Sequence, residues 1–136
     1  MVKLIVGSKG TGKTKALVEL VKRAVDQEDG SVVYLEKDKN LTYDIPHTVR
    51  LIHVNDYGFG SIEFFKGFIS GLHAGNYDIS HVFIDSLFKM FGETDMDRIA
   101  GLLDELDAFG KKEDINFTIT ATADPEAIGD NIKKYC

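Results

Sequence analysis

The sequence predicts an α/β protein with a mainly parallel sheet and helices on both faces. Three observations predict this fold class. Short apolar runs of strand length alternate with stretches in which apolar residues recur at helical spacing. A glycine-rich loop joins the first run to the first helical stretch, and a later run ends directly in an aspartate. Strands that alternate with helices are joined by crossovers, which make neighbouring strands parallel.

The first unit contains the most specific pattern in the chain. Residues 2–6 predict a buried strand and residues 16–24 a helix, and the loop between them matches G-x-x-x-x-G-K-[ST] at every fixed position. Lys13 would contact the β and γ phosphate oxygens, and the Thr14 hydroxyl would bind Mg²⁺. Backbone amides of the loop and the helix N-terminus would bind the other phosphate oxygens. We expect the nucleotide to contact Gly7, Ser8, Lys9, Gly10, Thr11, Gly12, Lys13, Thr14 and Lys15.

The middle of the chain predicts two strands and a helix. Residues 31–35 form a β-branched and aromatic run, and residues 48–54 form a second, more alternating run. A polar loop separates these two strands. Apolar residues then recur at helical spacing over residues 62–75, and Gly75 marks the expected end of this helix.

The next run ends in the second informative residue. The apolar strand at 82–84 continues directly into Asp85. The carboxyl ends of parallel strands meet at the sheet edge where open α/β folds bind ligands. Asp85 therefore suits the position that binds Mg²⁺ opposite a phosphate-binding loop.

A helix, a strand and a final helix are expected after Asp85. The helix covers 94–112, with a capping pattern at Thr94 and a C-terminal stop at Gly110. The strand covers 115–125. Asp124 and Pro125 are expected to begin the last helix.

Length and composition limit the classes of function. The 136 residues predict a single domain over 1–136, and 43% hydrophobic with 28% charged residues is an ordinary globular composition. The sequence contains no apolar stretch of membrane-spanning length and no signal-peptide core, so we expect a cytoplasmic protein without membrane contact. The net charge of −6 does not favour broad binding to nucleic-acid backbones. The single cysteine, Cys136, excludes an internal disulfide, and the four histidines lack metal-ligand spacing.

These motifs together resemble those of the RecA-like P-loop ATPases. The resemblance runs from the loop at 7–14 through VVYLEKD and HVFIDSLFKMFG to TITATAD. It implies a three-layer P-loop NTPase fold that binds ATP and Mg²⁺, with Glu36 activating the attacking water. It also implies that Thr120 or Thr122 contacts the γ-phosphate, in place of the glutamine or histidine often found there. Sites in this family are often completed across subunits, so the resemblance is also compatible with a homo-oligomer.

The leading hypothesis is a small Mg²⁺-dependent ATPase with slow basal hydrolysis. In it, Lys13 and Glu36 have catalytic roles, and Thr14 and Asp85 bind the metal. A nucleotide-binding switch or scaffold without significant turnover is the first alternative. A small-molecule kinase ranks third, because none of the three arginines falls in the final 38 residues. A GTPase ranks lower still, since no guanine-reading motif is present. Lys133 and Lys134 are weak candidates for a positive group supplied to another subunit.

Overall fold

The computed structural model describes residues 1–37, 44–93 and 95–136. Strands and helices alternate along most of the chain, as the sequence predicts. The strands are β1 (Val2–Gly7), β2 (Ser31–Glu36), β3 (Arg50–His53), β4 (Ile79–Ile84) and β5 (Asn116–Thr122). The α-helices are α1 (Lys13–Gln27), α2 (Ile62–Gly75), α3 (Met96–Glu113) and α4 (Asp130–Lys133). Two 3₁₀ turns, η1 (Val54–Tyr57) and η2 (Leu87–Lys89), follow β3 and β4.

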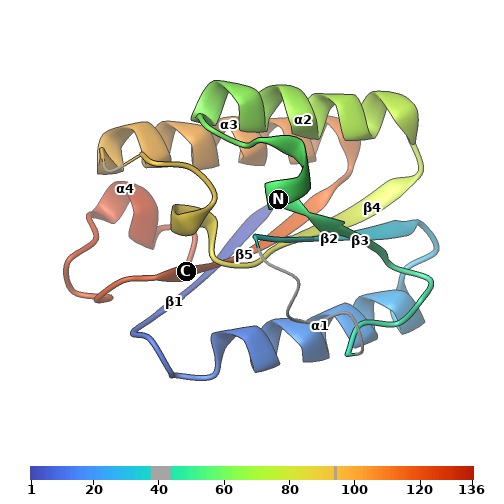
Figure 1. Cartoon of the computed structure of the whole chain (residues 1–136), viewed down its shortest axis with the longest axis horizontal. Coiled ribbons are helices and arrows are strands. Elements are labelled where there is room, and N and C mark those ends of the chain that lie inside the picture. The colour runs from blue at the N-terminus through green and yellow to red at the C-terminus, as the bar shows by residue number, and fades with distance from the viewer. Residues whose placement is uncertain (38–43, 94) are drawn as a thin grey trace.

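The five strands form one parallel sheet in the order β1-β5-β4-β2-β3. Figure 1 shows α1 on one face of this sheet and α2 with α3 on the other. The predicted α/β class with a parallel sheet and helices on both faces is confirmed. Because all strands run the same way, their carboxyl ends meet at one edge, where Gly7, Glu36, Asp85 and Thr122 lie.

Each face of the sheet has its own apolar core. Between the sheet and α1, Leu17 and Val21 pack with Tyr34 and Phe83. The larger core, on the face with α2 and α3, contains the fully buried Phe65, Ile99, Leu103, Phe117 and Ile119. Strand residues alternate between the two cores, since successive side chains of a strand point to opposite faces. The side chains of Tyr34, Phe83 and Thr120 therefore lie on the face that α1 covers.

The structure corrects several predicted boundaries. Strand β3 is shorter than residues 48–54, because Val54 begins a 3₁₀ turn. Helix α3 continues past Gly110 to Glu113, and Asp114 ends it in the left-handed conformation with φ 56°. The predicted cap Thr94 lies outside the described residues, and Asp95 caps α3 instead. The last helix begins at Asp130, not at Pro125, after a turn that starts at Asp124.

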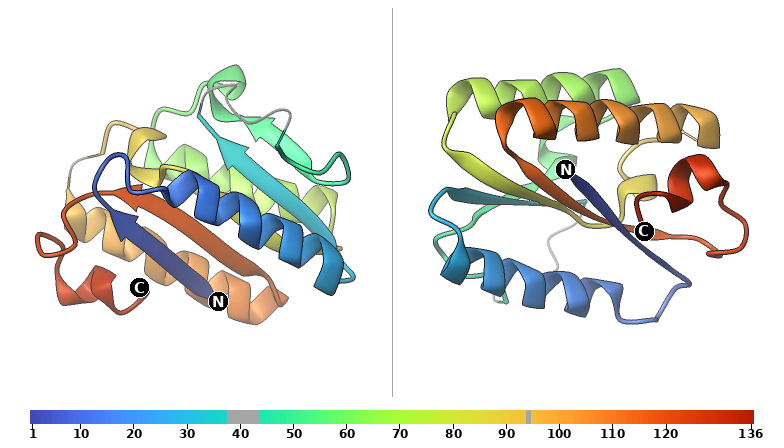
Figure 2. Two further views of the ribbon diagram at one scale, coloured as in Figure 1. Left: turned by 90° about the horizontal axis from the view of Figure 1, so that it is seen from below. Right: turned by 180° about the vertical axis from the view of Figure 1, so that it is seen from behind.

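The C-terminal segment covers the edge of the sheet at β1. The Leu4 amide donates to the Tyr135 carbonyl oxygen at 2.7 Å. Figure 2 shows α4 beside β1 and α3, with the chain end close to the sheet. This contact satisfies a backbone group that an uncovered edge strand would leave unpaired. Within the described part of the chain, no helix is long and apolar enough to cross a membrane.

Candidate functional site

The loop between β1 and α1 has the backbone that its glycines predict. Gly10 and Gly12 have positive φ angles of 82° and 81°, in a region that other residues rarely adopt. A Cβ on Gly7 would approach Thr11 Oγ1 at 2.6 Å, which leaves no space for a side chain. Local geometry therefore accounts for all three glycines.

The Lys13 ammonium folds back over the same loop. Its Nζ donates to the Ser8 carbonyl oxygen at 2.7 Å and lies 3.4 Å from Thr11 Oγ1. Thr11 Oγ1 also donates to the Ser8 carbonyl oxygen, at 2.8 Å. The charge of Lys13 thus faces neutral oxygens on an exposed loop. Hydrogen bonds between charged groups are stronger than these, so phosphate oxygens could replace the neutral acceptors.

The N-terminus of α1 lacks the groups that normally complete a helix start. Among the described residues no side chain caps it, and its first turn contains Lys13 and Lys15 and no acidic residue. By contrast, Ser61 caps α2 and Asp95 caps α3. Lysines at the positive end of a helix dipole are unfavourable in the absence of an anion. The first amides of α1 are therefore available to a negatively charged ligand.

Asp85 lies at the same sheet edge and contacts the start of α1. Asp85 is 8% exposed, and its carboxylate accepts hydrogen bonds from Tyr34 Oη and Thr120 Oγ1, both at 2.9 Å. Thr14 Oγ1 donates to it at 3.2 Å. No lysine, arginine or histidine of the described residues forms an ion pair with it. The structure thus brings together Thr14 and Asp85, the two residues predicted to bind Mg²⁺, around a buried negative charge.

Tyr34 supports this carboxylate from β2. Its ring is fully buried and stacks on Phe83 with 6.5 Å between ring centroids. Burial raises the pKa of Tyr34 far above its usual value, and the charge and hydrogen bond of Asp85 raise it further. Tyr34 therefore stays protonated and donates its hydroxyl hydrogen to Asp85. Sequence reasoning missed this role, because Tyr34 has the appearance of an ordinary core residue of a strand.

The two candidate threonines of β5 have different surroundings. Thr120 is fully buried; its hydroxyl donates to Asp85 and accepts from the Ser86 amide at 2.8 Å. Both hydrogen-bonding functions of this hydroxyl are thus used within the protein. Thr122, at the end of the strand, lines an open hollow beside the loop. The geometry favours Thr122 as the threonine that contacts a ligand and Thr120 as a residue that positions Asp85.

This hollow, which we call the loop hollow, has a volume of about 290 Å³. One wall is the loop itself, with Lys9, Gly10, Gly12, Lys13 and Thr14. A second wall is formed by Ser86, Lys89 and Thr122, which follow or end the strands β4 and β5. No acidic residue belongs to either wall. The loop hollow therefore combines lysine charges with a helix N-terminus, which is the chemistry that binds phosphate groups.

Lys89 was not anticipated from the sequence. It lies on η2, four residues after Asp85, and nothing in its local pattern distinguishes it from a solvated lysine. The remaining predicted contacts lie nearby. Ser8 and Thr11 form hydrogen bonds within the loop, and Lys15 lines a separate hollow together with Thr14.

Glu36 ends β2, next to the strand that leads to Asp85. It is 3% exposed, and its Oε1 lies 3.2 Å from His53 Nε2 at the end of β3. It is not among the residues that line the loop hollow. The structure therefore places Glu36 at the predicted edge, with its carboxylate turned towards β3.

The C-terminal lysines lie apart from the loop hollow. Lys134 Nζ pairs with Asp104 of α3 at 3.0 Å, which holds it on the opposite face of the sheet from α1. Lys133 is exposed on α4, one residue earlier. Neither residue belongs to the walls of the loop hollow.

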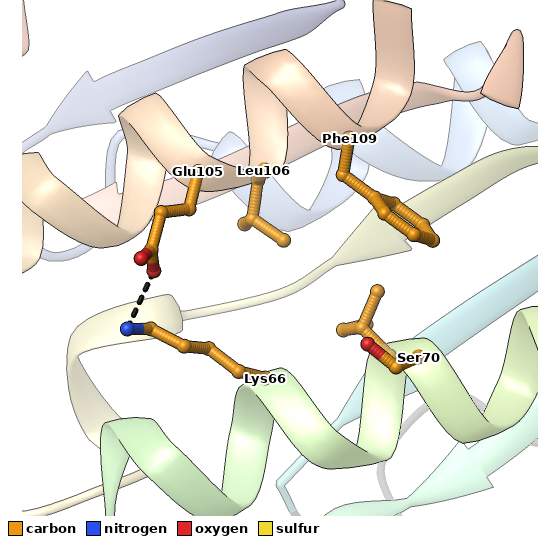
Figure 3. Close-up of a pocket in the computed structure, with 6 residues that line it drawn as sticks. Lys66, Ser70, Glu105, Leu106 and Phe109 are labelled. Atoms are coloured by element: carbon orange, nitrogen blue, oxygen red, sulfur yellow. Dashed lines mark ion pairs between the residues drawn. The ribbon is translucent and has the colours of Figure 1, made fainter. Parts of the chain in front are cut away.

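A second groove lies between α2 and α3, on the face away from α1. Figure 3 shows Lys66 of α2 paired with Glu105 of α3 across it, with Ser70, Leu106 and Phe109 further along. The charges in this groove thus neutralise one another. Its lining residues include a single lysine, whereas the loop hollow is lined by three lysines beside the N-terminus of α1.

The described residues contain no cluster of three or more histidine, cysteine, aspartate or glutamate side chains that could hold a metal ion. Mg²⁺ does not require such a cluster, because it usually keeps several waters and binds one or two protein oxygens together with substrate phosphates. The hydroxyl of Thr14 and the carboxylate of Asp85 fit that smaller requirement. Comparison of the chain with protein-family models and with curated proteins found no match.

Proposed function

We propose that this protein binds ATP with Mg²⁺ in the loop hollow and is a small ATPase of the RecA-like P-loop type. The observation that carries the proposal is the contact between Thr14 and Asp85 beside an uncapped helix N-terminus. It joins the complete phosphate-loop motif to a buried carboxylate 71 residues later in the chain. The parallel sheet with helices on both faces is compatible with the three-layer fold that the resemblance implies.

The residues of the site divide into three roles. The loop amides and Lys13 bind the β and γ phosphates. Thr14 and Asp85 would hold Mg²⁺, which would supply positive charge next to the phosphates. Thr120 and Tyr34 do not contact the nucleotide; they orient the Asp85 carboxylate through hydrogen bonds.

Hydrolysis is the second part of the proposal. A water oxygen attacks the γ-phosphorus, the bond from this phosphorus to the β–γ bridging oxygen breaks, and ADP and inorganic phosphate leave. Glu36 takes the proton of the water. Because its carboxylate is buried beside His53, Glu36 must turn towards the loop hollow first. Slow basal turnover follows from that requirement.

The same observation favours the alternative of a nucleotide-binding switch. If Glu36 stays beside His53, the site binds ATP and leaves the γ-phosphate intact. Turnover by the Glu36→Gln variant distinguishes the two functions. An ATPase should lose about 10²-fold or more of its rate while keeping ATP affinity within a few-fold. A switch should show the same negligible rate in both proteins.

Lys13→Ala tests nucleotide binding itself. Loss of a charge-assisted hydrogen bond to phosphate should weaken ATP binding by about 10- to 100-fold in calorimetry. Lys22→Ala is the matched control, because Lys22 is an exposed lysine further along α1 that pairs with Glu19 and does not line the loop hollow. Equal ATP affinity in the Lys13 variant and the wild type would refute the assignment of the site.

A further inference from the structure

The turn after β4 has an unusual backbone at Ser86. This residue is not a glycine, yet its φ of 62° and ψ of 59° place it in the left-handed region. Such a conformation persists only where neighbouring groups hold it. The Thr120 hydroxyl accepts from the Ser86 amide at 2.8 Å, and the Ser86 carbonyl oxygen accepts from the Lys89 amide at 3.0 Å. The strained turn is thus fixed from both sides.

The consequence of this turn is the position of Lys89. Leu87 is fully buried, and Met90 and Phe91 are 3% and 4% exposed, so the segment is anchored on both sides of Lys89. Lys89 itself is exposed and lines the loop hollow. The backbone therefore presents this one side chain to the site while its neighbours enter the core.

No described residue neutralises the charge of Lys89. Its ammonium forms no ion pair or hydrogen bond with the described residues. It shares the loop hollow with Lys9 and Lys13, and no acidic residue belongs to the walls. Three lysines around a hollow of about 290 Å³ repel one another unless an anion is bound. A single phosphate bound to the loop residues would leave Lys89, which comes from the turn after β4, without an anionic partner.

We infer that Lys89 binds the terminal phosphate of the nucleotide within the same subunit. This inference rests on the proposed function. Lys13 and the loop amides would hold the β-phosphate, and Thr14 and Asp85 would hold Mg²⁺ beside the loop. The γ-phosphate then points to the wall formed by the ends of β4 and β5, where Lys89 lies. ADP lacks this group, so Lys89 distinguishes the triphosphate from the diphosphate.

Calorimetry of Lys89→Met with ADP and with the non-hydrolysable triphosphate AMP-PNP, both with Mg²⁺, tests the inference. We expect AMP-PNP affinity to fall by about 10- to 100-fold and ADP affinity to stay within about two-fold. Lys89→Arg keeps the charge and should restore most of the AMP-PNP affinity. Lys112→Met is the control, because Lys112 is an exposed lysine of α3 near the start of β5, at the opposite sheet edge.

The outcomes separate the two proposals. Wild-type protein that binds neither nucleotide overturns the proposed function and this inference with it. Wild-type protein that binds both, with an unchanged preference for AMP-PNP in Lys89→Met, overturns the role of Lys89 alone. Equal weakening of both nucleotides in Lys89→Met also overturns it, because the residue would then contact the inner phosphates or support the fold. Circular dichroism of each variant confirms that it is folded.

Discussion

Replacing Thr120 by valine tests whether this residue positions Asp85. Valine has nearly the shape of threonine but no hydroxyl, so the change leaves packing intact. The fully buried Thr120 hydroxyl makes two hydrogen bonds, one to the Asp85 carboxylate at 2.9 Å and one from the Ser86 amide at 2.8 Å. Both would be lost together.

The size of the effect follows from these two contacts. A hydrogen bond to a charged group contributes about 1.5 to 3 kcal/mol, and an ordinary one about 1 kcal/mol. The free energy of unfolding should therefore fall by about 2.5 to 4 kcal/mol. For a domain of this size, roughly 4 °C per kcal/mol predicts a melting temperature lower by about 10 to 16 °C.

Thermal unfolding without ligand measures the change, with Thr122→Val as the matched control on the same strand. Thr122 ends β5 beside the loop hollow, so its replacement should leave the melting temperature within about 2 °C of wild type. For ATP affinity we expect Thr122→Val to have the larger effect of the two variants, because it removes a direct contact with the nucleotide. A Thr120→Val protein as stable as the wild type would refute the positioning role, and so would equal destabilisation by both variants.

Two further predictions concern charge. Asp85→Asn should remove the part of ATP affinity that depends on Mg²⁺ and leave binding in EDTA nearly unchanged; equal losses with and without metal, by calorimetry, would make Asp85 purely structural. His81 is held by Glu28 at 2.8 Å and Thr118 at 2.7 Å, and burial lowers its pKa although the hydrogen bond to Glu28 opposes this. In the unfolded chain His81 takes up a proton near pH 6.5, whereas in the folded protein it does so only at lower pH. The free energy of unfolding should therefore fall as the pH drops below about 6.5. Melting curves from pH 7.5 to 5.5 should show a smaller decline for His81→Gln; an unchanged decline would contradict this account.

Much of the fold could be predicted from local sequence. The alternation of apolar strands and amphipathic helices fixes the class, since each apolar face must be buried against another element. The motif at 7–14 could be identified from the sequence because its glycines, Lys13 and Thr14 lie within a few residues of one another. Asp85 could be placed at the edge of the sheet because parallel strands end together there.

The surroundings of Glu36, Thr120 and Thr122 depend on which strands are neighbours in the sheet, and this order could not be predicted from local sequence. Glu36 faces His53 because β3 pairs with β2, a pairing of residues 17 positions apart. Thr120 and Thr122 are two residues apart on a strand and point to the same face, so no pattern separates the fully buried residue from the partly buried one. The difference in burial arises because Thr122 ends β5 and Thr120 lies two residues before the end.

The sequence by itself therefore determined the class of the fold, the phosphate-loop motif and the edge where Asp85 lies, because each depends on local pattern or on a general rule of parallel sheets. Only the tertiary structure decided that Tyr34 and Thr120 hold Asp85, that Thr122 and Lys89 line the loop hollow, and that Lys134 pairs with Asp104. Such contacts join residues tens of positions apart. They depend on strand order and, for Lys89, on the left-handed turn at Ser86, which a hydrogen bond to Thr120 of β5 holds in place.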